Sequence, residues 1–152
     1  DAKFYWIGGI PFKHLGAEYS AMKKLIDNVP DNMTVTGVIQ LHEVRKYYAA
    51  ADVFVLPAMQ ENHPMCVLEA AGAGLPIVLR DIPQYNDTFR PDALMVTTDD
   101  EFTDAVRRLR NDSRLREKTI AGSRNIAQRF DSSSGAARAV EFYRQLLRGT
   151  MK

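Results

Sequence analysis

Residues 52–80, DVFVLPAMQENHPMCVLEAAGAGLPIVLR, contain two strand-like segments on either side of a helix-like segment. Residues 52–57 are almost entirely apolar, which is typical of a strand buried on both faces of a sheet. Residues 75–80 have the same character. Pro64 stands between them, and the first turn of a helix tolerates proline. The stretch therefore predicts a strand, a helix and a second strand, which is the repeating unit of a parallel sheet.

The rest of the chain continues this alternation up to Asp99, and from there only helices are predicted. The further expected strands are residues 3–8, 33–38 and 93–97, and the expected helices are residues 17–28, 42–51, 99–110, 113–130 and 133–148. We therefore expect an α/β fold, with a Rossmann-like parallel sheet between helix layers and a helical C-terminal tail. We expect residues 1–152 to form a single domain.

The composition is that of an ordinary soluble domain, with 45% hydrophobic and 26% charged residues. No apolar run approaches the ~20 residues that a membrane span requires. The single cysteine, Cys66, excludes an internal disulfide and fits a reducing compartment, so we expect a cytoplasmic protein. No metal-ligand cluster is visible in the sequence, and we expect neither a metal nor a cofactor.

Charge is distributed unevenly along the chain. Residues 1–100 carry 8 Lys and Arg against 13 Asp and Glu, a net charge of −5, whereas residues 101–152 carry 12 against 6, a net charge of +6. The basic segment is either a set of solvated helix faces or a surface that contacts an anionic membrane or an acidic domain. The membrane alternative would place the protein peripherally at the inner face of the membrane. The segment lacks interleaved aromatic residues, so we expect no nucleic acid partner.

Two glutamates, Glu61 and Glu69, flank the predicted start of the helix after the buried strand. A helix that begins near Pro64 would direct the N–H groups of residues 65–67 outward, and these groups with the helix dipole form a phosphate site. Carboxylates repel phosphate, but they accept hydrogen bonds from the hydroxyls of a sugar, as dinucleotide-binding folds do with ribose. A pyrophosphate between two carboxylates that each face a sugar describes a nucleotide sugar. The alternative is that both glutamates are ordinary exposed residues.

Residues 49–78, AAADVFVLPAMQENHPMCVLEAAGAGLPIV, resemble the donor-site signature of retaining GT-B glycosyltransferases of family 4. The matching positions are Ala51-Asp52, Pro57, Glu61, Glu69-Ala70 and Gly74-Leu75-Pro76, with Gly37 further upstream. The segments KFYWIGG and LRDIPQY are similar to bacterial enzymes that add glucose to diacylglycerol lipids. The resemblance implies the C-terminal, donor-binding half of a two-domain hexosyltransferase, with UDP-glucose as the first expected donor and a glycan or glycolipid as acceptor.

The resemblance also implies a role for each residue of the site. Glu69 would hold the ribose, and Glu61 would be the catalytic residue that faces the transferred sugar. The backbone amides of Asn62 and His63 would contact that sugar. The amides of Met65, Cys66 and Val67 would contact the phosphates, and the turn after Gly37, at Val38, Ile39 and Gln40, would lie near the base. No metal is implied.

The sequence departs from the family at three places. Asn62 and Pro64 stand where glycine is common. Neither Lys13 nor Arg80 matches the family's basic pair, and we expect Arg80 to form a local ion pair with Asp81. The N-terminal acceptor domain is missing, so we expect the isolated chain to transfer no sugar.

The same comparison implies that the first strand of the family is missing. That strand is central in the order 3-2-1-4-5-6. We therefore expect another segment to fill its place, or the strands of residues 3–8 and 52–57 to rearrange.

Other functions remain open from the residues alone. A sugar-nucleotide epimerase or a phosphorylase would share the architecture, but no lysine stands out for the pyridoxal phosphate of a phosphorylase. A non-catalytic nucleotide-binding or regulatory module of the doubly wound class is the alternative outside enzymology. A receiver-type module would require an acidic cluster at the strand ends, and Asp52 begins its strand instead of ending it.

Overall fold

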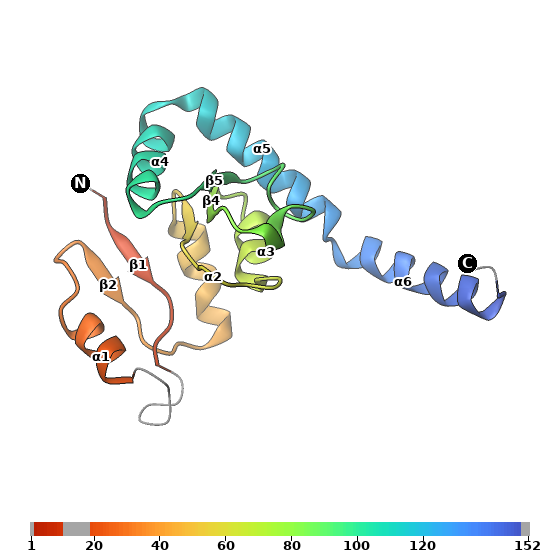
Figure 1. Cartoon of the computed structure of the whole chain (residues 1–152), viewed down its shortest axis with the longest axis horizontal. Coiled ribbons are helices and arrows are strands. Elements are labelled where there is room, and N and C mark those ends of the chain that lie inside the picture. The colour runs from red at the N-terminus through yellow and green to blue at the C-terminus, as the bar shows by residue number, and fades with distance from the viewer. Residues whose placement is uncertain (1, 11–18, 150–152) are drawn as a thin grey trace. The chain divides into compact units, whose positions relative to one another are not determined.

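The computed structural model describes residues 2–10 and 19–149. Lys13, which was compared with the family's basic pair, lies outside these residues. The chain divides into two compact units, Asp1–Ala49 and Ala50–Lys152, which are described here in turn. Figure 1 shows the elements in chain order. Helices and strands alternate as far as the fifth strand, and only helices follow it.

The first unit is built on two parallel strands. Its elements are β1 (Phe4–Trp6), α1 (Tyr19–Asp27), β2 (Met33–Val35) and α2 (Leu41–Ala50), which reaches the boundary of the unit. In the β1–β2 pair Tyr5 lies opposite Thr34. Just beyond the pair, Gly8 bridges Gly37, and Gly37 has a φ of 68°, which favours glycine.

The second unit contains the remaining three strands, all parallel and in the order β3-β4-β5. Its elements are β3 (Phe54–Leu56), α3 (Met65–Gly72), β4 (Ile77–Arg80), the 3₁₀ turn η2 (Pro83–Tyr85), β5 (Leu94–Val96), α4 (Asp99–Asn111), α5 (Ser113–Arg129) and α6 (Ser132–Leu147). β4 is therefore the central strand, and the carboxyl ends of all three strands lie at one edge of the sheet.

Helices cover both faces of β4. Val78 packs on one face with Phe102, Ala105 and Leu109 of α4. Because side chains alternate along a strand, Ile77 and Leu79 point to the other face, where α3 and α5 contact β4. These three β4 side chains are fully buried. The apolar segment expected from the sequence is thus a strand between two helix layers.

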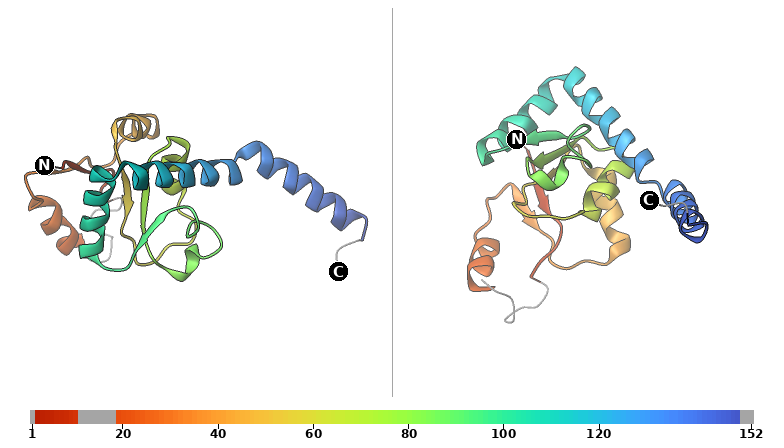
Figure 2. Two further views of the ribbon diagram at one scale, coloured as in Figure 1. Left: turned by 90° about the horizontal axis from the view of Figure 1, so that it is seen from above. Right: turned by 45° about the vertical axis from the view of Figure 1, so that its right-hand side comes forward.

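The helix α5 is held close to α3 and to the chain that precedes β5 (Figure 2). The Ser123 hydroxyl is fully buried. It donates a hydrogen bond of 2.5 Å to the carbonyl of Leu75, in the connection between α3 and β4. Nearby, Gly122 meets the backbone of Asp92 so closely that an added Cβ would lie 1.9 Å from its carbonyl oxygen. Glycine is required at position 122 for this reason.

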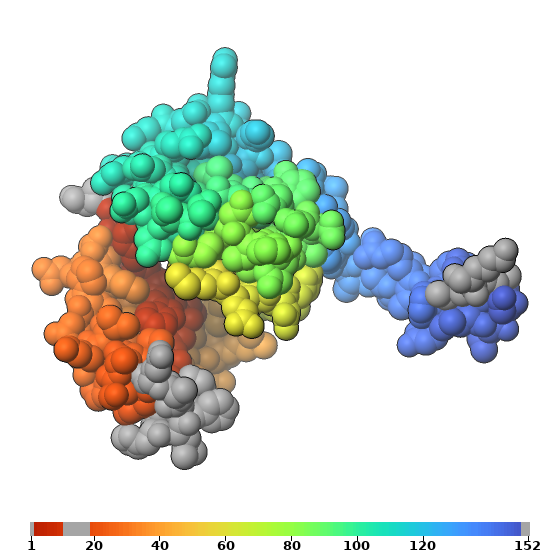
Figure 3. All heavy atoms as spheres, in the orientation of Figure 1, coloured from red at the N-terminus to blue at the C-terminus, as the bar shows by residue number. Residues whose placement is uncertain are grey.

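The last helix, α6, contains no buried residue. In Figure 3 its atoms, in blue, continue from the end of α5. Exposed apolar side chains, including Phe142, Tyr143 and Leu147, are found on it. Within the part of the chain that the structure describes, none of the helices is both long enough and apolar enough to cross a membrane.

The predicted fold class is confirmed, because parallel strands alternate with helices and a helical region follows. The expected single sheet is instead two sheets of two and three strands among the described residues. Their orders, β1-β2 and β3-β4-β5, are those expected when the first family strand is missing from the order 3-2-1-4-5-6. What pairs with the edges of β1 and β3 that the missing strand would occupy stays a prediction, as does the single domain.

Candidate functional site

The loop from Pro57 to Pro64 follows the carboxyl end of β3 and leads into α3. Pro64 is the N-cap of α3, with an extended backbone (φ −69°, ψ 115°), and no side chain caps the helix there. The apolar face of α3 is fixed in the core, because Val67 and Ala70 are fully buried. The first-turn N–H groups therefore belong to a rigid helix end at the carboxyl edge of the sheet, where ligands bind in such folds.

One of the three expected phosphate donors already has an acceptor. The N–H of Val67 donates to the carbonyl of Pro64 at 3.1 Å, so it is not directed outward as the sequence analysis expected. The proline N-cap explains this difference, because its extended backbone turns the Pro64 carbonyl toward the first turn. Helix geometry provides no intrahelical acceptor for the amide of Met65.

In the sequence, Glu61 precedes the start of α3 and Glu69 follows it. Both carboxylates raise the pKa of the same side chain, Cys66. Burial raises the pKa of the Cys66 thiol, and the negative charges of Glu61 and Glu69 raise it further. Hydrogen bonds from the backbone at Val67 and Cys66 act in the opposite direction. The charges of both carboxylates therefore contribute to the electrostatics of the helix start. The Cys66 thiol is held protonated, as expected for a small packing residue and not for a nucleophile.

Glu61 is half-buried in the loop, whereas Glu69 is exposed on α3. The charge of Glu61 also contributes to raising the pKa of Tyr85 to about 12, after the larger effect of burial. The phenol of Tyr85 is therefore within the electrostatic influence of the Glu61 carboxylate. The sequence analysis did not identify Tyr85.

Aromatic rings anchor the far end of the loop. The His63 ring stacks on Phe89 with a centroid distance of 5.4 Å and meets Phe130 edge-on at 5.0 Å. Tyr85 packs edge-on against the same Phe89 at 5.3 Å. His63 is exposed, but its ring is also a support that fixes the backbone of the loop.

The expected ion pair between Arg80 and Asp81 is wrong. Arg80 pairs with Asp99, and Asp81 accepts a hydrogen bond of 3.0 Å from Arg90. Neighbouring residues of a strand point to opposite faces, so each finds a partner elsewhere.

The base-binding residues expected from the resemblance belong to the first unit. Gly37, Val38 and Ile39 lie between β2 and α2, beyond the carboxyl end of β2. An added Cβ on Gly9 would lie 3.1 Å from the Cα of Gly37, so the two chain segments meet at backbone contact. The Val38 side chain is largely exposed.

The described residues of the second unit bring together the loop residues Glu61, Asn62 and His63 with the helix residues Met65, Cys66, Val67 and Glu69. Asn62 is exposed. Within residues 2–10 and 19–149 there is no group of three or more His, Cys, Asp or Glu side chains that could hold a metal ion. The arrangement offers backbone donors for an anion and carboxylates for hydroxyl groups.

Sequence reasoning missed the supports of the loop, which are Arg80, Tyr85, Phe89 and Phe130. An arginine at the end of an otherwise apolar strand was the signal for Arg80. The aromatic supports come from η2, from the turn after it and from the end of α5, and no short motif links them.

Residues 1–112 match the protein family described as glycosyl transferases group 1. The chain is 27% identical over 140 residues to an alpha-galactosylglucosyldiacylglycerol synthase of Streptococcus pneumoniae, covering 92% of this chain and 37% of that protein. It is 32% identical over 87 residues to a processive diacylglycerol alpha-glucosyltransferase of Acholeplasma laidlawii, covering 57% of this chain and 25% of that protein. The chain thus spans less than half the length of these relatives.

Solved structures show the same fold. A sucrose-phosphate synthase from Thermosynechococcus elongatus superposes with a TM-score of 0.76 and 25% identity, covering 95% of this chain and 38% of that one. The Anabaena protein HepE in complex with UDP-glucose gives a TM-score of 0.74 at 14% identity, over 94% of this chain and 41% of that one.

Proposed function

This chain belongs to the glycosyl transferases group 1 family, and on that premise we propose that it binds the nucleotide sugar in a retaining hexosyltransferase. Its fold is that of the C-terminal half of a GT-B enzyme. The first donor we propose is UDP-glucose, and the acceptor is a glycan or a glycolipid. The acceptor site would belong to a further domain, since the chain covers only 37% of the length of its lipid-glycosylating relative.

One observation supports the proposal above all others. A rigid helix N-terminus, without a side-chain cap, lies beyond a buried parallel strand, with Glu61 before it and Glu69 inside it. Helix N-termini of this kind bind phosphate. The charges of both carboxylates are felt at Cys66 in the first turn, where the diphosphate would bind.

The proposed roles follow from these positions. The amides of Met65 and Cys66 bind the diphosphate, and the Val67 amide shares its proton between Pro64 and a phosphate oxygen. Glu69 accepts hydrogen bonds from the ribose hydroxyls. Glu61, with the amides of Asn62 and His63, holds the transferred hexose. Gly37, Val38 and Ile39 contact the base.

The proposed reaction requires no metal. As the glycosidic bond breaks, negative charge develops on the leaving diphosphate, and the positive end of the helix dipole stabilises it there. The acceptor hydroxyl attacks from the face on which the diphosphate leaves, and the diphosphate takes its proton, so the anomeric configuration is retained. Glu61 contributes by holding the hexose so that its anomeric carbon faces the attacking hydroxyl.

We further propose that the complete protein works in the cytoplasm, at the inner face of a membrane. The relatives named above are lipid glycosyltransferases by name. Residues 101–152 carry a net charge of +6, and anionic lipids attract such a segment.

Calorimetry of the chain with a panel of nucleoside diphosphates and their sugar conjugates, in EDTA, tests this proposal. We expect weak binding of UDP and of UDP-glucose, with other bases and sugars binding less well. Binding that EDTA abolishes would contradict the metal-free site. No binding to any member of the panel would favour a non-nucleotide function, and transfer of sugar by the chain alone would contradict the need for a further domain.

A further inference from the structure

The guanidinium of Arg80 joins the carboxyl ends of all three strands of the second unit, and we infer that Arg80 is a positioning residue for the hexose part of the site. It would act through the loop that carries Glu61, without touching the ligand. The inference rests on the proposed function, because it assigns Arg80 to the sugar-binding step of that function.

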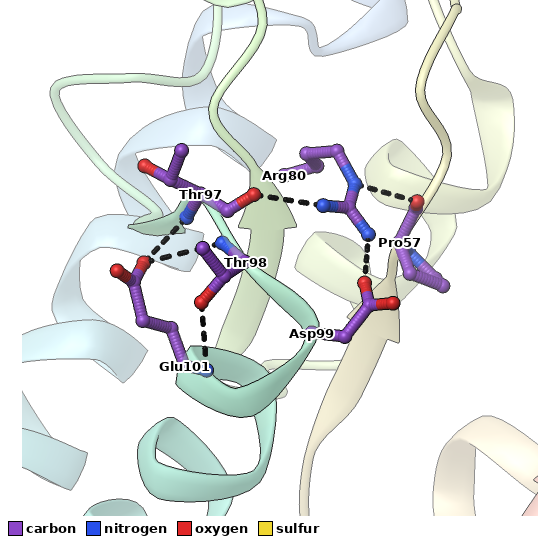
Figure 4. A network of polar contacts seen from close by, with 6 residues as sticks. All are labelled: Pro57, Arg80, Thr97, Thr98, Asp99 and Glu101. Carbon is purple, nitrogen blue, oxygen red and sulfur yellow. Dashed lines mark hydrogen bonds and ion pairs between the residues drawn. The ribbon is translucent and has the colours of Figure 1, made fainter.

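Three hydrogen bonds hold the guanidinium (Figure 4). The Nε atom donates to the carbonyl of Pro57, at the end of β3, with a distance of 2.9 Å. One terminal nitrogen donates to the carbonyl of Thr97, just after β5, at 2.8 Å, and the other to the carboxylate of Asp99 at 2.5 Å. The guanidinium supplies these donors from three separate nitrogens in one plane, whereas the three donors of a lysine ammonium all come from one nitrogen.

The Arg80 side chain has little freedom to leave this position. It is only 11% exposed and packs over the ring of Phe102 at 5.2 Å. Its backbone extends the fully buried part of β4. The three contacts therefore act on a preformed group, and the entropic cost of ordering it is small.

The same contacts argue against a direct role in anion binding. Asp99 is 86% exposed and carries the charge that offsets Arg80. A guanidinium whose charge is already paired and that uses three of its five N–H donors attracts a phosphate less strongly than a free one does. The geometry fits a structural support and not a phosphate ligand.

Pro57 is the first residue of the loop, and Glu61 follows it four positions later. The far end of the loop has its own support, since the His63 ring packs on two phenyl rings. The helix α3 is held independently by Val67 and Ala70 in the core. Loss of the Arg80 contact should therefore move Glu61 and leave the helix N-terminus, and with it the diphosphate site, in place.

The test compares Arg80→Met and Arg80→Lys with the wild-type chain, titrating each with UDP and with UDP-glucose. We expect the affinity for UDP to change by less than about twofold. The additional affinity for UDP-glucose should fall by about tenfold, because most of one hydrogen bond to a charged group is lost. Arg80→Lys should not restore it. Hydrogen exchange should quicken in residues 58–63 and remain unchanged in α3.

Two controls separate positioning from general destabilisation. Arg116→Met removes hydrogen bonds of 2.8 Å to the carbonyls of Leu109 and Arg110 at the end of α4, and should leave the sugar increment unchanged. Asp99→Asn removes the charge but keeps both carbonyl contacts of Arg80, and should also bind as the wild type does.

The outcomes are distinguishable. Failure of the wild-type chain to bind UDP would overturn the proposed function, and equal wild-type affinity for UDP and UDP-glucose would overturn both the role of Glu61 and this inference. If the wild-type chain shows the sugar increment and the Arg80 variants keep it, only the inference is wrong. Equal weakening of UDP and UDP-glucose by Arg80→Met would show a diphosphate contact or a general structural role instead.

Discussion

Tyr85 has a hydroxyl whose hydrogen-bonding capacity is not used. It is fully buried, and among the described residues its hydroxyl has no hydrogen-bond partner. A buried donor without an acceptor costs about 1–3 kcal/mol. Tyr85→Phe removes that donor, so we expect the free energy of unfolding to rise by about 1 kcal/mol. Urea denaturation measures it, with the exposed Tyr143→Phe as a control that should change nothing.

The same side chain predicts a dependence on alkaline pH. Burial, then Glu61, raises the pKa of Tyr85 from 10.0 to about 12, so the folded state binds the phenol proton more tightly than the unfolded chain does. Titration of this phenol therefore leaves the free energy of unfolding unchanged below about pH 10 and lowers it as the pH rises toward 12. Wild type should lose more stability than Tyr85→Phe across this range. Parallel curves for the two proteins would contradict the buried position of the phenol.

Among single residues, sequence reasoning located those with a motif and missed those without one. The positions of Glu61 and Glu69 followed from their spacing around a predicted helix start. The partners of Arg80 and Asp81 did not, because they come from residues that are distant in the sequence: Asp99 and Arg90. Such pairings depend on strand order and on the faces of the sheet, which a single sequence does not specify.

The helices and strands themselves were predicted to within a few residues. The end signals are physical: Thr98 and Glu101 form a capping box at the start of α4, and Asp112 caps α5. The 3₁₀ turn η2 was missed because it is a single turn without apolar periodicity. The sequence analysis expected that the family's central strand is missing. It did not predict that the described strands form two separate sheets.

Gly122, in α5, allows a prediction about how closely this helix packs. A Cβ at this position would lie 1.9 Å from the Asp92 carbonyl oxygen and 2.8 Å from its carbon, so α5 must move away from the turn before β5. We expect Gly122→Ala to lower the free energy of unfolding by about 1–3 kcal/mol, as overpacking does.

Gly135 is the matched control, because it also lies in a helix and an added Cβ meets nothing within 4 Å. Gly135→Ala should leave stability unchanged or raise it by up to about 1 kcal/mol, since alanine favours helix. Thermal unfolding of both variants decides the point. Equal effects would show that the α5 contact does not restrict position 122.

For the whole molecule, the uneven charge predicts attachment to anionic membranes. Each Lys or Arg near such a surface contributes about 1 kcal/mol, so a few of the basic residues of α4–α6 suffice for reversible binding. Sedimentation at low salt should recover the chain with anionic vesicles and not with neutral ones, and high salt should release it. Equal recovery with both kinds of vesicle would exclude charge as the cause.

The central claim is that Glu61 and Glu69 hold two different sugars of one ligand, and a titration of two variants against two ligands tests it most directly. Glu69→Ala should weaken UDP and UDP-glucose alike, by roughly ten- to a hundredfold, because a hydrogen bond to a charged group contributes about 1.5–3 kcal/mol. Glu61→Ala should leave UDP binding nearly intact and remove the additional affinity for UDP-glucose. Equal losses for both variants with both ligands would contradict the division of roles, and no loss in any combination would contradict the site itself.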